Sequence, residues 1–362
     1  MILEANCKTT AMGIMPHTDV ERALDLALSL DIPFWPQLPK VSFYEDMYAQ
    51  VSEGFPGVRI DVEGEKVDFS HRDFEEDLER YSRHIEDPAT FELSQDYSVV
   101  FHKFFEGDLK RYPAIRGQTT GPVSYGFKIV DENLKPIIYN EEIRALLFDF
   151  IQRKLNAQYQ TLVKKNRNAF VWLDEPGLGW VFNSLSGYND VEAKEDYRSF
   201  LSGVESPKAL HLCADVNLPY LLELGLDLLS FDAYQMEIMP RAYTDDVGRF
   251  IESDGIVSWG LVPTDSSTLG QETPETLTNL LLNYWGVIAE NSGVPLERIA
   301  RQALIAPARC CLKNIGAVGA DDDFTGNVAC SCNISSVEEK VVERAFAYVK
   351  QVSEILREKF NL

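Results

Sequence analysis

The sequence predicts an α/β protein built as a (β/α)8 TIM barrel. Short apolar strands alternate with amphipathic helices, a pattern that implies parallel strand pairing. Eight strand candidates occur, centred near residues 10, 34, 116, 171, 210, 230, 259 and 304. Several of these strands end in polar residues, which a barrel would collect at one face.

Length and charge limit the functions that the chain can have. Its 362 residues, 45% of them hydrophobic, predict a single barrel domain over residues 1–362, since such barrels often exceed ~250 residues. No apolar run reaches the ~20 residues of a membrane span, so we expect no membrane contact. The formal net charge of −23 disfavours nucleic acid as a partner. The first residues do not resemble a secretory signal, so we expect a cytoplasmic protein.

The first strand and helix follow from apolar spacing. Lys8–Met15 reads as a strand, and Asp19–Leu30 has helical spacing with Asp19 as its N-cap. Residues 33–39 contain three prolines, which cannot donate to a strand ladder. We therefore expect a short second strand that runs into a loop.

Residues 40–110 are predicted to form an insertion after the second strand. Val58–Phe69 alternates apolar and polar residues about a Glu-Gly-Glu turn, which is typical of a half-exposed hairpin. Asp73–His84 and Ser94–Glu106 have the spacing of amphipathic helices. The insertion therefore holds a hairpin and helices.

From residue 114 onward, strands and helices alternate regularly. The predicted strands are Ala114–Thr120, Ala169–Leu173, Lys208–Ala214, Leu228–Phe231, Ile256–Val262 and Arg301–Ala306. The predicted helices are Glu141–Lys165, a segment containing Tyr197–Leu201, Leu218–Leu224, residues 239–252, Pro274–Glu290 and Ser336–Lys359. Ser336 and Glu339 have the spacing of a capping box at the start of the last helix.

A histidine and two cysteines at strand ends predict a metal site. His211 and Cys213 are two residues apart, so on a strand they point to the same side. The alternative is a hydrogen-bonded core histidine beside a small buried cysteine. Cys310 and the carboxylate of Asp232 also follow strands, and a donor set of nitrogen, sulfur and oxygen suits zinc. We therefore predict a zinc site built from His211, Cys213, Asp232 and Cys310.

The donor set also indicates the chemistry. Zinc held by one histidine and two thiolates can bind a substrate thiol and withdraw its proton, which favours alkyl transfer onto sulfur. The competing reaction is activation of water for hydrolysis, but such sites usually hold histidines and carboxylates. Cys330 and Cys332 lie in a polar stretch and are expected to be free thiols.

Seven motifs, in order along nearly the whole chain, resemble those of the methionine synthase and uroporphyrinogen decarboxylase-like superfamily. They are Met12-Gly-Ile-Met-Pro-His17, Trp35-Pro-Gln-Leu-Pro39, Gly121-Pro-Val123, Asp174-Glu-Pro-Gly-Leu178, His211-Leu-Cys213, Leu229-Ser-Phe-Asp232 and Ala306-Pro-Ala-Arg-Cys-Cys-Leu312. The chain most resembles the short core methionine synthases, which depend on a corrinoid. The resemblance implies a (β/α)8 barrel and a zinc-dependent methyltransferase that forms methionine from homocysteine.

The resemblance also implies roles for single residues at the metal. His211 and Cys213 match the paired zinc ligands of the family, and Cys310 matches its distal cysteine. Cys311 stands where the family has glycine, so the adjacent thiol is an alternative ligand. Asp232 stands where the family usually has glutamate as its carboxylate ligand.

Around the substrate, Asp174 matches the catalytic aspartate that binds the amino group of homocysteine, with Glu175 beside it in the substrate site. Ile14 stands where longer methionine synthases have a serine that holds the substrate carboxylate. His17 or backbone amides are expected to take over that contact.

Two missing features concern the methyl donor. The chain has no counterpart of the tryptophan that follows Gly-Pro-Val in the long enzymes and stacks on folate, and it has no Asp-x-His-x-x-Gly corrinoid motif. This favours methylcobalamin or another methylcorrinoid, carried by a partner corrinoid protein, as donor. The alternatives are another methyltransferase of the superfamily, acting on coenzyme M or on a corrinoid and folate pair, and a non-catalytic subunit that binds a corrinoid protein.

Overall fold

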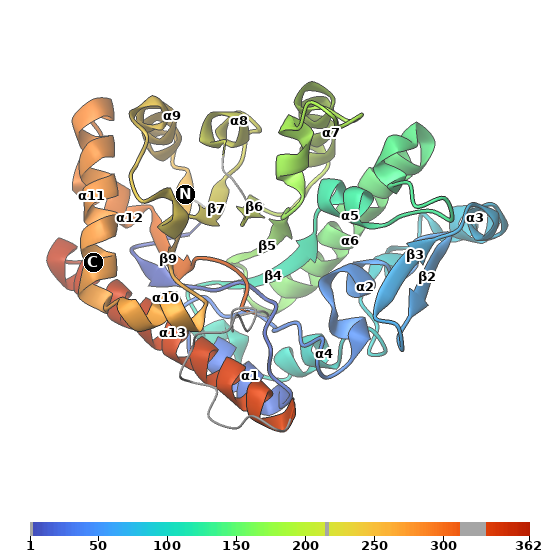
Figure 1. Ribbon diagram of the computed structural model, residues 1–362, viewed down its shortest axis with the longest axis horizontal. Coiled ribbons are helices and arrows are strands. Elements are labelled where there is room, and N and C mark those ends of the chain that lie inside the picture. The colour runs from blue at the N-terminus through green and yellow to red at the C-terminus, as the bar shows by residue number, and fades with distance from the viewer. Residues whose placement is uncertain (1–2, 214–216, 312–330) are drawn as a thin grey trace.

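The computed structural model describes residues 3–213, 217–311 and 331–362, with side chains in the last segment described from residue 336. Its centre is a curled parallel sheet in which seven strands are ordered β1-β9-β8-β7-β6-β5-β4, with helices around it (Figure 1). The strands are β1 Lys8–Thr9, β4 Ile115–Thr120, β5 Ala169–Asp174, β6 Lys208–Leu212, β7 Leu228–Asp232, β8 Ile256–Val262 and β9 Ala303–Pro307. The predicted α/β class and parallel pairing are confirmed.

The predicted second strand lies between the two edge strands of this sheet but forms no ladder. Arg116 of β4 donates its backbone N–H to the carbonyl of Pro33, and Gln37 donates to Gly13 beyond β1, at 3.0 and 2.8 Å. Isolated bridges join Phe34 to Arg116 and Ile14 to Gln37. Prolines interrupt the segment and cannot donate, which explains the broken pairing. Closure into a full eight-stranded barrel stays a prediction.

Alternation along the strands divides the sheet into an inner and an outer face. A separate apolar cluster includes Ala114, Trp172, Ala209, Leu228 and Ile256, one from each of five neighbouring chain segments. Because side chains two positions apart share a face, the next inner positions toward the carboxyl ends are polar. These positions are Arg116, Asp174, His211, Ser230 and Ser258. The inner face therefore changes from apolar to polar toward the end where barrel enzymes build their sites.

Helices cover the outer face of the sheet. They are α1 Val20–Leu28, α5 Pro122–Lys128, α6 Glu141–Lys165, α7 Asp190–Ser202, α8 Leu218–Leu222, α9 Arg241–Glu252, α10 Ser266–Gln271, α11 Pro274–Ser292, α12 Leu296–Arg301 and α13 Ser331–Phe360. Asp19 caps α1 as predicted, because its carboxylate accepts from the N–H groups of Glu21 and Arg22. No helix in the described ranges is long and apolar enough to cross a membrane.

The last helix fastens the start of the chain. Glu339 of α13 accepts hydrogen bonds from the N–H and the hydroxyl of Thr18 at 3.1 and 3.2 Å, and it pairs with Arg22 of α1. The hydroxyl of Ser353 donates to the carbonyl of Cys7 at 2.6 Å. Helix α13 is thus joined to the start of the chain by the buried hydrogen bond of Ser353 as well as by the ion pair of Glu339.

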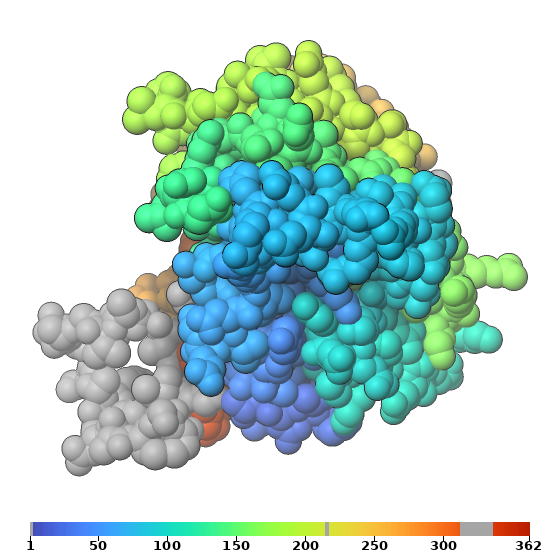
Figure 2. All heavy atoms as spheres, turned by 90° about the vertical axis from the view of Figure 1, so that its right-hand side faces the viewer, coloured from blue at the N-terminus to red at the C-terminus, as the bar shows by residue number. Residues whose placement is uncertain are grey.

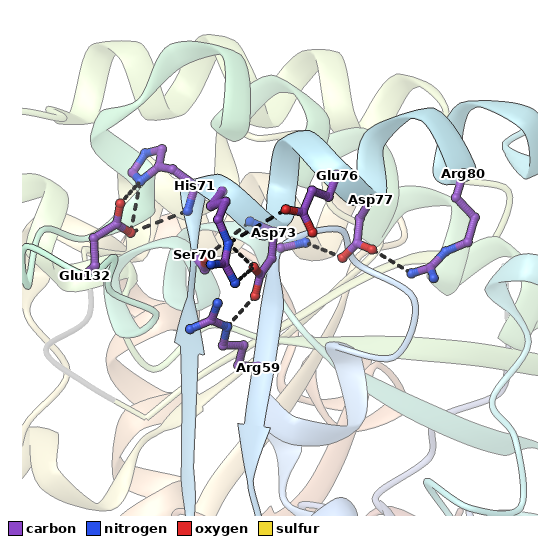
Figure 3. Close-up of polar contacts among 10 residues, drawn as sticks. Arg59, Ser70, His71, Asp73, Glu76, Asp77, Arg80 and Glu132 are labelled. Atoms are coloured by element: carbon purple, nitrogen blue, oxygen red, sulfur yellow. Dashed lines mark hydrogen bonds and ion pairs between the residues drawn. The ribbon is translucent and has the colours of Figure 1, made fainter.

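Residues 40–110 contain α2 Met47–Val51, the hairpin strands β2 Val58–Asp61 and β3 Lys66–Phe69, α3 His71–His84 and α4 Val99–Phe104. The predicted hairpin is confirmed by its antiparallel register. Figure 3 shows Arg59 of the hairpin bonded to Asp73 of α3, and His71 at the start of α3 bonded to Glu132 in the segment after α5. In Figure 2 the segment of residues 40–110 occupies the middle of the face that is shown. Its status as an insertion in a single domain stays a prediction.

Several predicted boundaries were wrong. The ladder of β1 covers only Lys8–Thr9, because residues beyond it turn toward the proline-rich segment. The helix predicted from Ser94 begins at Val99, after Ser98 caps it through the N–H of Phe101. Helix α12 extends to Arg301, so β9 begins later than predicted. Ser336 lies inside α13, not at its start, so the predicted cap is wrong.

Candidate active site

The residues predicted for the site lie at the carboxyl ends of neighbouring strands. Asp174 at the end of β5 is the register partner of His211 on β6, and Asp232 ends β7. Cys213 directly follows β6, and Cys310 lies three residues after β9. Carboxyl ends of parallel strands share one edge, so the structure brings these side chains to the same end of the sheet.

His211 is held in a form that can bind a metal. Its side chain is buried, and its Nδ1 lies 3.0 Å from the hydroxyl of Ser230. Its Nε2 is buried and has no hydrogen-bond partner in the described part of the chain. Burial, helped by the charge of Arg116, lowers the pKa of His211 to about 3, so the ring is neutral. With the proton on Nδ1, Nε2 presents a free lone pair, as in histidine ligands oriented by a second group.

Cys213 lies within electrostatic range of the other predicted ligands. Burial raises the pKa of its thiol, and the negative charges of Cys310, Asp174 and Asp232 raise it further, while Arg309 lowers it. The thiol therefore keeps its proton near neutral pH unless a cation is added. A bound divalent metal reverses that balance.

Asp232 is buried and already paired. Its Oδ2 accepts from Nε of Arg309 at 2.8 Å, and its Oδ1 accepts from the N–H of Gln235 at 3.1 Å. Burial raises the pKa of Asp232, while the bonds to Gln235 and Arg309 lower it. The carboxylate thus closes the loop after β7 and is held by Arg309 and Gln235.

The predicted ligands have the chemical groups that zinc binds, but their side chains are not gathered around one point. One imidazole with a free buried Nε2, two thiols and a carboxylate are the donors that zinc prefers. Within the described ranges, however, no three His, Cys, Asp or Glu side chains are gathered closely enough to hold a metal ion. The chain therefore offers the ligands without a formed cage, and the zinc ligand set stays a prediction.

Asp174 and Glu175 have opposite surroundings. Oδ1 of Asp174 is buried and has no partner among the described residues. Burial raises the pKa of Asp174 to about 7, with Arg116 lowering it and Glu175 raising it. Such a carboxylate can accept from a ligand ammonium group.

In Glu175, by contrast, both carboxylate oxygens have hydrogen-bond partners within the protein. Its two carboxylate oxygens accept from the N–H of Val123, from both the N–H and the hydroxyl of Ser124, and from the hydroxyl of Tyr197. Gly121 leaves room for this carboxylate, because a Cβ there would lie 2.1 Å from its Oε1. Glu175 therefore fixes the start of α5, and its predicted contact with substrate stays untested.

Ile14 and His17 lie near the loop after β9 and near α13. The carbonyl of Ile14 accepts from the N–H of Cys311 at 3.3 Å, which ties this loop to the end of β1. His17 is fully buried, and neither ring nitrogen has a described partner. Burial lowers the pKa of His17, and Glu339 of α13 is the main group that raises it. Neither residue contacts Asp174 or His211 among the described interactions.

Sequence reasoning missed Arg116 and Ser230. Ser230 orients the imidazole of His211, and Arg116 acts electrostatically on both His211 and Asp174. The signal for Arg116 was a charged residue inside an otherwise uncharged strand. Cys330 lies outside the described residues, as does the side chain of Cys332, so the expectation of free thiols is untested.

A separate cavity of about 300 Å³ lies between α4, α6 and β4. Phe101, Phe105, Lys154 and Gln158 are among its lining residues. None of the predicted ligands lines it. We therefore place the candidate site at the strand ends and not in this cavity.

Comparisons with known proteins give the fold a precedent. No protein-family profile and no curated protein matches the chain. A methyltransferase from Methanosarcina mazei has 14% sequence identity and a TM-score of 0.51, over 98% of this chain and 94% of that one. A B12-independent methionine synthase from a Shewanella species has 12% identity and a TM-score of 0.44, over 68% of this chain. The chain spans 63% of the length of that synthase. At such identities, the similarity to the Methanosarcina methyltransferase shows a shared fold and nothing finer.

Proposed function

We propose that the chain is a zinc-dependent methyltransferase. It would move a methyl group from a methylcorrinoid, such as methylcobalamin, to the thiol of homocysteine and form methionine. The observation that carries this proposal is His211, whose Nδ1 is bonded to Ser230 while its Nε2 has no described partner, and which is the register partner of Asp174. The methyltransferase fold and the motif series agree with it.

In this proposal, His211, Cys213 and Cys310 hold zinc, with Asp232 as the fourth ligand. The bound metal would lower the pKa of the substrate thiol, so that its nucleophilic thiolate is present near neutral pH. The contact with Ser230 orients the imidazole ring of His211. Asp174 would bind the ammonium group of the amino acid and so orient its thiol.

The pKa of Asp174 gives this binding step a pH dependence. A carboxyl group with a pKa of about 7 is largely neutral at lower pH and ionised at higher pH. Its attraction for an ammonium group therefore grows as pH rises through about 7.

Exposed apolar side chains at the same end of the sheet support a protein partner. Trp180 and Leu185, in the loop after β5, are 60% and 92% exposed, and Ile238, after β7, is 73% exposed. Contiguous exposed apolar surface favours docking of another protein. In the proposal, that partner is the corrinoid protein that brings the methyl group.

One observation favours a second candidate, a non-catalytic subunit that binds a corrinoid protein. The described side chains do not gather three metal donors. Within the first proposal, other substrates would suit the same methyl transfer. They are coenzyme M as the acceptor in place of homocysteine, or a corrinoid and folate pair.

Metal analysis of the purified chain separates these candidates. We expect about one zinc per chain, lost in Cys213→Ser and Cys310→Ser and kept in Cys7→Ser. Cys7 is the matched control, because it is also a buried thiol but precedes β1 at the other end of the sheet. If Cys311→Ser lost zinc while Cys310→Ser kept it, Cys311 and not Cys310 would be the zinc ligand. A folded wild-type chain without zinc would favour the non-catalytic subunit.

The acceptor is tested by calorimetric titration of the zinc-loaded chain with homocysteine and with coenzyme M. We expect homocysteine to bind and release a proton as its thiol becomes a thiolate. If coenzyme M released a proton on binding and homocysteine did not, coenzyme M would be the methyl acceptor. If neither thiol binds, the proposed transfer onto sulfur is wrong.

A further inference from the structure

The inner face of the sheet carries buried polar atoms that the protein leaves unpaired. Five of them lack a hydrogen-bond partner in the described part of the chain. They are Nη2 of Arg116, Nε1 of Trp172, Oδ1 of Asp174, Nε2 of His211 and Oγ of Ser258. Native proteins leave few such atoms, since each costs free energy. We call these five residues the inner polar set and ask what molecule would complete their bonds.

Arg116 is the member of the inner polar set that carries a fully buried guanidinium group. It is fully buried on β4, and its guanidinium stacks on the ring of Phe34 at 4.4 Å. Nε donates to Thr10 at 3.1 Å, and Nη1 donates to Oε1 of Gln118 at 2.9 Å. These contacts fix the guanidinium and leave the N–H groups of Nη2 unbonded. Its position is set before any ligand arrives.

The charge of this guanidinium is also uncompensated. Arg116 forms no ion pair within the described ranges, and Asp174 is the acidic group that acts on it. Burial lowers the pKa of Arg116 to about 9, so the group is still charged near neutral pH. Removing a charge from water without a partner is strongly unfavourable. An anionic ligand group would offset that cost.

The inner polar set contains both kinds of partner that an amino acid needs. Arg116 and Trp172 offer free N–H donors, which match a carboxylate. Asp174 offers a free acceptor oxygen, which matches an ammonium group. The inner face therefore offers a partner for each charged group of an amino acid.

We infer that Arg116 binds the α-carboxylate of the acceptor amino acid, while Asp174 binds its ammonium group. This inference rests on the proposed function and deepens it. It names the group that holds the substrate carboxylate, and it disfavours thiols that lack a carboxylate. The free donors are the N–H groups of Nη2, so a charge-assisted bond from this one nitrogen would hold the carboxylate.

Ligands that lack one charged group test the inference. The zinc-supplied full chain is titrated calorimetrically with homocysteine, with 3-mercaptopropylamine, which lacks the carboxylate, and with 4-mercaptobutanoate, which lacks the amine. We expect Arg116→Met to weaken the two carboxylates about 10- to 100-fold and to leave 3-mercaptopropylamine nearly unchanged. Asp174→Asn is the matched control, and it should weaken the two amines and spare 4-mercaptobutanoate.

The remaining outcomes separate the inference from the proposed function. If Arg116→Met weakens all three ligands equally, or none, Arg116 is structural and the inference is wrong. If wild type binds none of them, the proposed function fails and the inference fails with it. Should Arg116→Met not fold, Arg116→Lys, which keeps the charge but not the guanidinium, takes its place. It should reduce, without abolishing, the preference of about 10-fold or more that wild type has for homocysteine over 3-mercaptopropylamine. An unchanged preference in Arg116→Lys would make the inference wrong.

Discussion

Two buried polar regions of this protein are built in opposite ways. Around Glu175, every carboxylate oxygen accepts hydrogen bonds from α5 or from Tyr197. In the inner polar set, each residue keeps one buried atom without a described partner. The two regions meet at the end of β5, where Asp174 and Glu175 are adjacent in sequence. The difference indicates that the first region stabilises the fold and that the second is arranged for a ligand.

The largest test of this comparison removes the centre of the paired region. Glu175→Ala leaves the N–H groups of Val123 and Ser124 and the hydroxyl of Tyr197 buried without an acceptor. We expect a loss of about 3–5 kcal/mol in the free energy of unfolding, measured by chemical denaturation. Glu175→Gln keeps one acceptor oxygen and should lose less. A loss under about 1 kcal/mol for Glu175→Ala would remove the distinction between the regions.

A second test asks whether hydrogen bonds alone make a buried carboxylate favourable. Glu45 accepts from the hydroxyl of Ser98 at 2.8 Å and from the N–H of Val100 at 3.2 Å. Burial nevertheless raises the pKa of Glu45 from 4.5 to about 7, against the effect of these bonds. The folded state thus binds this proton more tightly than the unfolded state, so this contribution to stability is present below about pH 4.5 and lost as pH rises through about 7.

We expect the loss to be about 2–3 kcal/mol between about pH 5 and about pH 8. Glu45→Gln, which cannot ionise, should flatten the stability over this range, as denaturant unfolding at the two pH values would show. An unchanged pH dependence in the variant would assign the loss to another group.

The smallest test compares two buried serines directly. The hydroxyl of Ser124 donates to Glu175 and accepts from the N–H of Gly177 at 2.8 Å, whereas that of Ser258 has no described partner. Ser124→Ala should therefore lose about 1–2 kcal/mol of unfolding free energy, and Ser258→Ala should change it by less than about 0.5 kcal/mol. Equal losses, measured by the same denaturation, would mean that Ser258 has a partner in the folded chain.

Most of the fold could be predicted because apolar periodicity is a local signal. Helix α6 has the predicted bounds, with Asn140 as its cap, and the hairpin of β2 and β3 forms where alternation predicted it. Boundaries failed where distant contacts decide them. Residues after Thr9 turn away from the β1 ladder because they pair with Gln37 in the proline-rich segment. No local pattern reports such a contact.

The site was predicted only in part, for a related physical reason. Residue type and spacing identified His211 and Cys213 as possible ligands, and the strand register confirms that His211 lies beside Asp174. Spacing could not show that Asp232 is bonded to Arg309, or that Glu175 is saturated by α5 while Asp174 is not. Those facts depend on which side chains meet across strands. The uncharged neighbours of Arg116 in β4 indicate that it is buried, but they could not show that it acts on His211 and Asp174 of other strands.

The contacts between α13 and the start of the chain have a consequence for how the protein is made. Strand β1 pairs with β9, and Thr18 bonds to Glu339, which follows it by 321 residues. The ribosome therefore releases the partners of the first strand about 300 residues after that strand, and the segment around β1 must wait for them with its apolar surface uncovered. Contacts so distant in sequence slow folding, and they leave early intermediates open to aggregation. We expect refolding of the full chain to be slow and to require α13.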